Sequence, residues 1–95
     1  MRVVWAPEAR DDLKAVFDFI ARDDPQAARA VVERILSLVE THLPTTPNIG
    51  RPGRIDGTRE LIVAGTPFIV PYRLKDDAVE VLRVYHAARR WPSAL

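Results

Sequence analysis

Apolar residues recur at helical spacing over the first half of the chain. After Pro7 the apolar positions, three and four residues apart, are Ala9, Leu13, Val16, Phe17 and Ile20. After Pro25 a second apolar stripe consists of Ala28, Val31, Val32, Ile35, Leu38, Val39 and Leu43. Each stripe predicts an amphipathic helix, and proline suits the first position of both helices. Because only a few residues separate the stripes, we expect an antiparallel helical hairpin.

The segments on either side of this hairpin have the character of β-strands. Residues 3–5 are apolar and β-prone, which predicts a short strand before the first helix. Residues 45–57 carry the densest proline and glycine content and predict a loop. Three further β segments follow, at residues 58–63, 68–74 and 78–85. The short turns between them predict an antiparallel meander.

The order β-α-α-β-β-β predicts an α+β fold, an N-terminal strand and a three-stranded meander with the helical hairpin packed on one face of the sheet. The other face of an antiparallel sheet would then stay partly open. Pro71 interrupts the middle segment, and because proline cannot donate to a ladder, it predicts a bulge or a position without a hydrogen bond.

Length, composition and charge narrow the class of protein. A chain of 95 residues accommodates one core, so we expect residues 1–95 to form a single domain. It has no cysteine and two well-separated histidines, which leave no metal site, and we expect no cofactor. No apolar run approaches the roughly 18 residues that span a bilayer, so we expect a cytoplasmic protein. The net charge of +1 is far from the strongly basic balance typical of nucleic-acid binders.

Three arginines lie in the predicted meander, one in each strand. If Arg59, Arg73 and Arg83 project from the same open face, they form a cationic patch able to bind a phosphodiester. With Tyr85 or His86 as a proton carrier, that patch would be a minimal ribonuclease site. The alternative is that these arginines pair with acidic residues as ordinary surface charges, the candidates being Glu60, Asp76, Asp77 and Glu80.

Near the C-terminus, Arg89, Arg90 and Trp91 place two guanidinium groups beside an indole. This combination is typical of protein hot spots and of surfaces that stack on a nucleic-acid base. The sequence therefore predicts a contact surface for a target or a partner here. The alternative is that Trp91 folds back and closes one edge of the core.

Several segments taken together resemble the RelE/ParE toxins over essentially the whole chain. They are residues 5–9, 12–13, 19–20, 25–28, 50–53, 57–61, 68–73 and 84–92. Their order is specific in combination with Gly57-Thr58-Arg59-Glu60-Leu61 and the terminal His86-Ala87-Ala88-Arg89-Arg90-Trp91-Pro92. The resemblance implies a growth-arresting toxin of a type II toxin–antitoxin system. It also implies a partly disordered antitoxin that folds on binding, the pair contacting operator DNA only through the antitoxin.

The resemblance leaves two molecular targets open. RelE-like toxins cut messenger RNA on the ribosome with basic and tyrosine side chains, whereas ParE-like toxins lack a nuclease site and poison DNA gyrase. RelE-like nucleases have a lysine-rich stretch before the second strand, where this sequence has Arg51 and Arg54 but no lysine. With the small net charge, this departure favours gyrase. Ribosome-dependent cleavage of messenger RNA and a non-toxic interaction module are the alternatives.

We also expect the antitoxin to contact the helical hairpin. An antitoxin helix would lie in a groove beside the hairpin, and an extended segment would lie near the sheet. On the first helix the candidate contact residues are Leu13, Phe17 and Ile20.

Overall fold

Two helices and six strands make up the computed structural model, which describes residues 1–95. In chain order they are β1 (Arg2–Trp5), α1 (Pro7–Ala21), α2 (Pro25–His42), β2 (Arg51–Pro52), β3 (Arg59–Ile62), β4 (Phe68–Lys75), β5 (Ala78–Val81) and β6 (Tyr85–His86). The predicted β-α-α-β-β-β order is confirmed, with β2 as an additional short strand inside the predicted loop. Neither helix has the length and apolar content needed to cross a membrane.

The strands form one sheet in the order β1-β5-β4-β3-β2, with β6 paired to β4. The antiparallel meander of β3, β4 and β5 is confirmed. The expectation of an antiparallel sheet is wrong at one edge, because β1 runs parallel to β5. The helical hairpin returns the chain to the start of β1, where the amino group of Met1 donates a hydrogen bond to the Pro44 carbonyl at 2.8 Å. Because β1 is parallel to β5 and the other strand pairs are antiparallel, the sheet is mixed.

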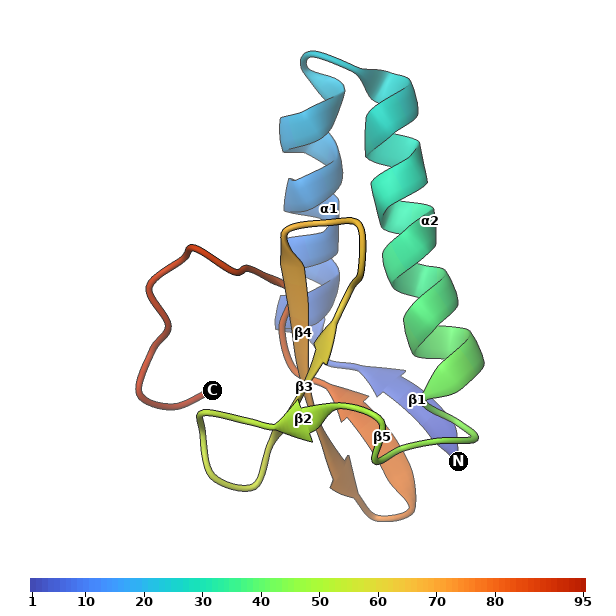
Figure 1. Cartoon of the computed structure of the whole chain (residues 1–95), viewed down its shortest axis with the longest axis vertical. Coiled ribbons are helices and arrows are strands. Elements are labelled where there is room, and N and C mark those ends of the chain that lie inside the picture. The colour runs from blue at the N-terminus through green and yellow to red at the C-terminus, as the bar shows by residue number, and fades with distance from the viewer.

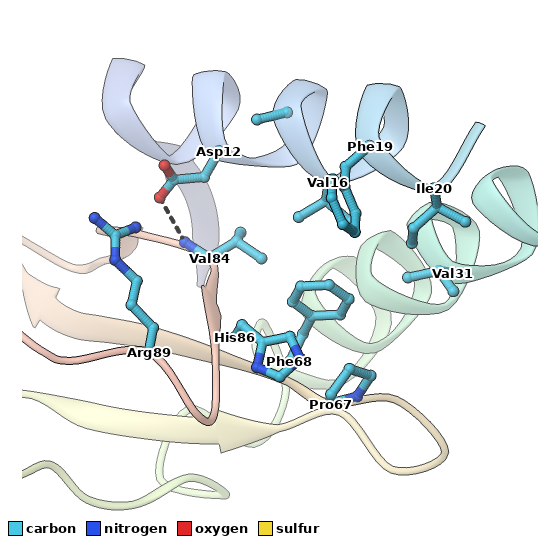
Figure 2. A pocket seen from close by; sticks show the side chains of 11 residues that line it. Asp12, Val16, Phe19, Ile20, Val31, Pro67, Phe68, Val84, His86 and Arg89 are labelled. Carbon is cyan, nitrogen blue, oxygen red and sulfur yellow. Dashed lines mark hydrogen bonds between the residues drawn. The ribbon is translucent and has the colours of Figure 1, made fainter. Parts of the chain in front are cut away.

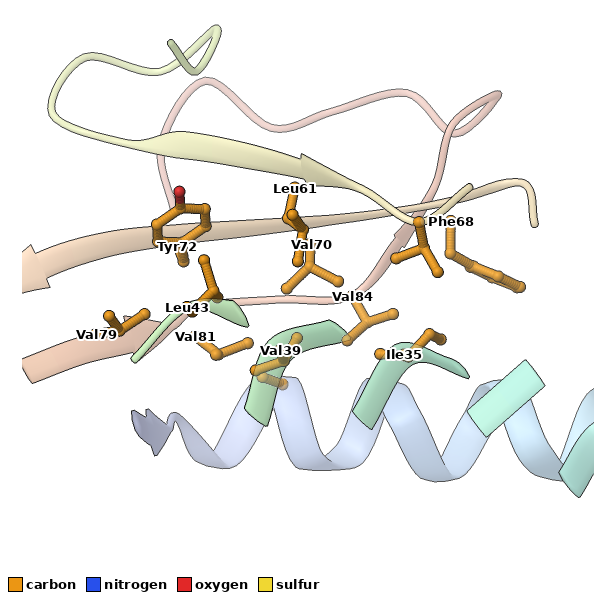
Figure 3. Packing of buried hydrophobic residues seen from close by; sticks show 12 residues of the cluster. Ile35, Val39, Leu43, Leu61, Phe68, Val70, Tyr72, Val79, Val81 and Val84 are labelled. Atoms are coloured by element: carbon orange, nitrogen blue, oxygen red, sulfur yellow. The ribbon is translucent and has the colours of Figure 1, made fainter. Parts of the chain in front are cut away.

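The core lies between the helical hairpin and one face of the sheet (Figures 1 and 3). Its buried members include Ile35 and Val39 of α2 and alternate residues in and directly after the strands, Leu61, Val63, Val70, Tyr72, Val79 and Val81. In α1 only Ala9 is fully buried, whereas Leu13, Val16 and Ile20 are partly buried against the cluster. The far ends of both helices extend past the β3–β4 turn (Figure 1). Consequently α1 keeps much of its apolar surface uncovered.

A β-bulge divides the predicted last strand into β5 and β6. Tyr72 pairs with Val81 and Ile69 pairs with Tyr85, so two residues of β4 lie opposite three residues, 82–84. Pro71 lies at this point, and its carbonyl accepts a hydrogen bond from the N–H of Leu82 at 2.9 Å. The bulge predicted from Pro71 is thus confirmed. The extra residue shifts the alternation of side chains, which places Val84 in the core and Tyr85 on the opposite face.

The proline- and glycine-rich loop is fixed to the core by Tyr72. Its buried hydroxyl donates to the carbonyl of Pro47 at 2.7 Å and accepts from the N–H of Gly50 at 2.9 Å. A Cβ atom at Gly50 would lie 2.7 Å from the Tyr72 side chain, so any larger residue would collide with the ring. Burial raises the pKa of Tyr72, and the hydroxyl stays protonated and able to donate. The loop is therefore held in one place.

Candidate functional site

Four side chains from three segments gather around Tyr85, which lies on the sheet face that points away from the helices. Tyr85 pairs with Ile69, whose neighbours Phe68 and Val70 point into the core, so Tyr85 lies on the other face. We call the set the arginine–aromatic cluster, which consists of Arg54, Arg83, Tyr85, Arg89 and Trp91. The Trp91 ring meets the Tyr85 ring edge-on at 4.9 Å between centroids.

Guanidinium groups cover both aromatic rings of this cluster. The Arg54 guanidinium lies 3.7 Å from the centroid of Trp91, and those of Arg83 and Arg89 lie 4.8 and 4.6 Å from the centroid of Tyr85. Tyr85 is 1% exposed, and neither its hydroxyl nor the Trp91 Nε1 has a hydrogen-bond partner. Trp91 folds back onto Tyr85, on the face opposite the core, and does not close an edge of the core as the alternative expected. Arg89 and Arg90 stay exposed.

Glu60 anchors the cluster from β3, although its carboxylate is only 2% exposed. Its Oε1 accepts from Arg51 Nε and Nη2 at 3.1 and 2.8 Å, and its Oε2 accepts from Arg54 N and Nε at 2.9 and 3.0 Å. Burial alone would raise the pKa of Glu60. The N–H of Arg54 and the two guanidinium groups outweigh burial and hold this pKa below its ordinary value of 4.5, so the carboxylate is ionised at neutral pH.

Asp12 connects α1 to the bulge. Its carboxylate accepts from Arg83 Nε and Nη2 at 2.7 and 3.0 Å and from the N–H of Val84 at 3.0 Å. The hydrogen bond to Asp12 raises the pKa of Arg83, opposed by burial and supported by the Asp12 charge. This bidentate pair fixes where β6 begins and therefore where Tyr85 lies. Since 71 residues separate the two side chains, the pair could not be predicted from the sequence.

The three strand arginines do not converge on one patch. Arg59 lies in register with Tyr72, on the helix side of the sheet, and its Nη1 donates to the carbonyls of Gly50 and Asn48 at 2.7 and 3.3 Å. Arg73 makes an ion pair with Glu80, and Arg83 makes one with Asp12. The placement on a shared open face is thus wrong for Arg59, because its strand position has the parity of Leu61.

The two proton carriers considered from the sequence lie in different surroundings. Tyr85 is enclosed by the cluster, whereas His86 is exposed beside β4. The Nδ1 of His86 accepts from the N–H of Ala88 at 3.1 Å, and its ring meets Phe68 edge-on at 5.6 Å. His86 thus keeps only Nε2 free for other partners. No group of His, Asp and Glu side chains able to hold a metal ion is present.

Apolar grooves lie on both sides of α1. The inner groove, of about 430 Å³, runs between α1 and β4 and is lined by Asp12, Ala15, Val16, Phe19, Ile20, Val31, Pro67, Phe68, Val84, His86 and Arg89. Figure 2 shows Val16 and Phe19 facing this groove from α1 and Phe68 facing it from β4. The outer groove, of about 640 Å³, is lined by Trp5, Arg10, Leu13, Lys14, Phe17, Asp18, Val32, Leu36 and Glu40.

The three antitoxin contacts predicted from the sequence are divided between the two grooves. Leu13 and Phe17 line the outer groove, and Ile20 lines the inner groove. Phe19, which the sequence reasoning did not single out, is 69% exposed at the inner groove. A large exposed apolar side chain at a groove is typical of a surface that another polypeptide covers. In the sequence, an apolar residue outside the main stripe of the first helix, directly before Ile20, was the sign that Phe19 would be exposed.

The fold is that of a small α+β domain with an apolar groove on each side of its first helix. The family model described as the ParE toxin of type II toxin–antitoxin system, parDE, matches residues 3–91. The chain therefore belongs to the ParE toxin family, and it is the toxin of a type II toxin–antitoxin system. This match confirms the RelE/ParE resemblance seen in the sequence.

Relatives with similar sequences carry toxin names. The chain is 46% identical over 94 residues to "Putative toxin Y4kP" of Sinorhizobium fredii, covering 99% of this chain and 96% of that protein. It is 34% identical over 88 residues to "Toxin RelE2" of Caulobacter vibrioides, covering 93% of this chain and 97% of that protein. Both alignments span nearly the full length of each protein, so the likeness extends beyond single motifs.

Solved structures of toxin–antitoxin systems share the fold. A chain of the chromosomal ParDE system from P. aeruginosa superimposes with a TM-score of 0.82 at 30% identity, covering 90% of this chain and 95% of that chain. A chain of the toxin–antitoxin complex RelBE2 from Mycobacterium tuberculosis gives a TM-score of 0.60 at 29% identity, covering 93% and 92%. Together with the family, these complexes support an antitoxin as the partner of this chain.

Proposed function

We propose that this toxin arrests growth without catalysis, by binding DNA gyrase and poisoning it after DNA strand passage. The observation that supports this proposal most is the separation of the nuclease candidates. Arg73 and Arg83 are each paired with a carboxylate, Arg59 lies on the other face, and the Tyr85 hydroxyl is buried. A general acid or base needs to reach the proton that it transfers, which a buried hydroxyl does not. Gyrase and the ribosome are both cytoplasmic, so the proposal places the toxin there.

The gyrase contact in this proposal is the surface formed by Arg89, Arg90 and Trp91. Arg89 and Arg90 are exposed and make no ion pair, so their guanidinium groups are available to a carboxylate or phosphate of the target. Arginine and tryptophan are enriched at the residues that carry most of the binding energy in protein interfaces.

A supercoiling assay with purified toxin tests this assignment. Wild-type toxin is expected to inhibit supercoiling, and the double variant Arg89→Ala/Arg90→Ala is expected to need a concentration at least about tenfold higher, since losing about 1.4 kcal/mol of binding changes affinity tenfold. Arg29→Ala removes an exposed arginine from α2 and serves as the matched control, with unchanged potency. Equal potency of the double variant and wild type would remove the assigned contact.

Ribosome-dependent cleavage of messenger RNA is the second candidate. It is favoured by the likeness to the relative named Toxin RelE2 and by the closeness of Arg83 and Arg89 to Tyr85. This candidate predicts cleaved messenger in a translating extract, and cleavage should disappear in Arg83→Ala or His86→Ala. Intact messenger with wild-type toxin would rule the candidate out.

We further propose that the cognate antitoxin covers α1 from both sides, with an amphipathic helix in one groove. The support is that α1 buries only Ala9 fully, while Leu13, Phe17, Phe19 and Ile20 line the two grooves. Helices that lay an apolar face into a groove place anchor residues three, four and seven positions apart. An antitoxin acidic residue near Arg89 would complete the inner contact. Operator DNA would then be contacted by the antitoxin alone.

A further inference from the structure

We propose that Glu60 is a positioning residue that fastens the C-terminal strap, residues 87–95, to the open face of the sheet. It acts through Arg54 and Trp91. The consequence for activity rests on the function proposed above, in which Arg89 and Arg90 contact gyrase. The fastening itself depends only on the geometry of this chain.

The first step is the fixing of Arg54 by Glu60. Oε2 of Glu60 accepts from both the backbone N–H and the Nε of Arg54, at 2.9 and 3.0 Å, and Oε1 lies 3.3 Å from its Nη2. Arg54 is therefore held at its backbone and at its guanidinium by one carboxylate. Arg51 binds the same carboxylate and lies in register with Glu60 between β2 and β3, so the carboxylate cannot turn away. The plane of the Arg54 guanidinium is thus fixed relative to the sheet.

The second step is the contact between Arg54 and the strap. The guanidinium of Arg54 lies 3.7 Å from the centroid of the Trp91 ring, which is the distance of direct stacking. On the way to Trp91, the strap makes a backbone hydrogen bond from Ala87 to the Pro67 carbonyl at 2.7 Å and a turn from Arg89 to His86 at 2.9 Å. After Arg89 no backbone hydrogen bond joins the strap to the rest of the chain. Trp91 is therefore its anchor.

The third step is the effect on the exposed arginines. Arg89 and Arg90 lie between the Ala87 hydrogen bond and the Trp91 contact, so anchoring at both ends restricts where their guanidinium groups point. Arg89 is further held over the Tyr85 ring at 4.6 Å. A contact surface that is ordered before binding loses less conformational entropy on binding than a mobile one. Detaching Trp91 should therefore weaken target binding without removing any contact group.

The neighbouring ion pair on the same face provides a matched comparison. Arg73 and Glu80 are cross-strand partners on β4 and β5, and they form an ion pair as Arg54 and Glu60 do. No hydrogen bond or guanidinium stacking joins either residue to Trp91 or Tyr85. Glu80→Gln therefore removes a carboxylate charge from the same face and leaves the strap attached.

Fluorescence of Trp91 tests the fastening directly. Trp5→Phe leaves Trp91 as the single tryptophan of the full chain, and in this background we compare Glu60→Gln, Arg54→Lys and Glu80→Gln. Glu60→Gln and Arg54→Lys should shift the emission to longer wavelength and increase acrylamide quenching at least twofold. Arg54→Lys keeps the charge but loses the planar group that stacks on the ring. Glu80→Gln should match the background.

Circular dichroism of each variant establishes that it is folded. Should Glu60→Gln fail to fold, Arg54→Lys and Arg54→Ala carry the test, because Arg54 is exposed and its loss leaves Glu60 bound to Arg51. Trp91 quenching unchanged in the folded Arg54 variants would overturn the proposal.

Gyrase inhibition measured with the same variants tests the consequence. Glu60→Gln should raise the toxin concentration for half-maximal inhibition several-fold and leave maximal inhibition unchanged. Unchanged potency with a detached strap would overturn the positioning role of Glu60 in activity. Absence of gyrase inhibition by wild-type toxin would instead reject the proposed function, and the fluorescence result would still decide whether Glu60 fastens the strap.

Discussion

Single buried polar groups fix the segments around the candidate site. The Tyr72 hydroxyl accepts a hydrogen bond from the N–H of Gly50 and donates one to the carbonyl of Pro47. The Tyr85 hydroxyl is also buried but has no hydrogen-bond partner. Tyr72→Phe is expected to lower the free energy of unfolding by about 1–3 kcal/mol, since it leaves the buried N–H of Gly50 unsatisfied. Tyr85→Phe is the control and should be neutral within about 0.5 kcal/mol. Urea unfolding measures both, and equal effects would contradict the assigned role of the Tyr72 hydroxyl.

The ionisation of Glu60 makes the stability of the toxin depend on pH. Because its pKa is lower in the folded state than its ordinary value of 4.5, the carboxylate stabilises the fold fully above about pH 4.5. This contribution is lost as the pH falls from there through the lowered folded-state pKa. Glu60→Gln should therefore lose stability at pH 7 and show a shallower decline below pH 4.5, measured by thermal unfolding across the pH range. A decline as steep as in wild type would contradict this account.

The ion-pair partner of an arginine could be predicted from the sequence only where the two residues lie close together in the chain. Glu80 was one of the four acidic residues expected as possible partners of the arginines, and Arg73 indeed pairs with it across one turn. The partner of Arg83 is Asp12, on a helix at the other end of the chain. No spacing rule relates those two positions, since the contact arises only when α1 packs beside the bulge.

Among the helices and strands, the start of α2 could be predicted from a local signal in the sequence. Asp24 caps the helix, accepting from the N–H groups of Gln26 and Ala27 at 3.1 Å each, and Pro25 occupies the first turn. Asp24→Ala should cost about 1 kcal/mol of stability, the usual value for losing such a cap. The adjacent Asp23 makes no capping contact. Asp23→Ala should therefore change the free energy of unfolding by less than about 0.5 kcal/mol. Thermal unfolding that shows equal losses for the two variants would contradict the cap.

The strands were less predictable than the helices. Pro71 signalled a bulge, but the sequence did not indicate on which strand the extra residue lies. Because that residue falls between Val81 and Tyr85, it reverses the facing of everything after it. The face of Tyr85 could therefore not be worked out by counting parity along the last strand. The parallel direction of β1 could not be predicted either. A strand of four residues does not show which other strand it pairs with or in which direction.

In the molecule as a whole, the first helix lies between two apolar grooves. Phe19→Asp should weaken antitoxin binding at least about thirtyfold, because a central apolar anchor contributes about 2 kcal/mol or more. Ile62→Asp is the matched control, since Ile62 is 53% exposed but lies in neither groove. Calorimetric titration with the antitoxin measures both affinities. Equal affinities would show that the inner groove is not the contact.

In the proposed mode of action, the toxin acts by occupying gyrase and not by turnover. The most direct measurement is the amount of cleaved plasmid formed by gyrase as purified toxin is titrated against it. We predict that cleaved DNA accumulates with toxin and levels off once toxin saturates the gyrase present, while messenger RNA in a translating extract stays intact. Normal supercoiling at saturating toxin, with messenger RNA cut by toxin far below the ribosome concentration, would contradict the claim.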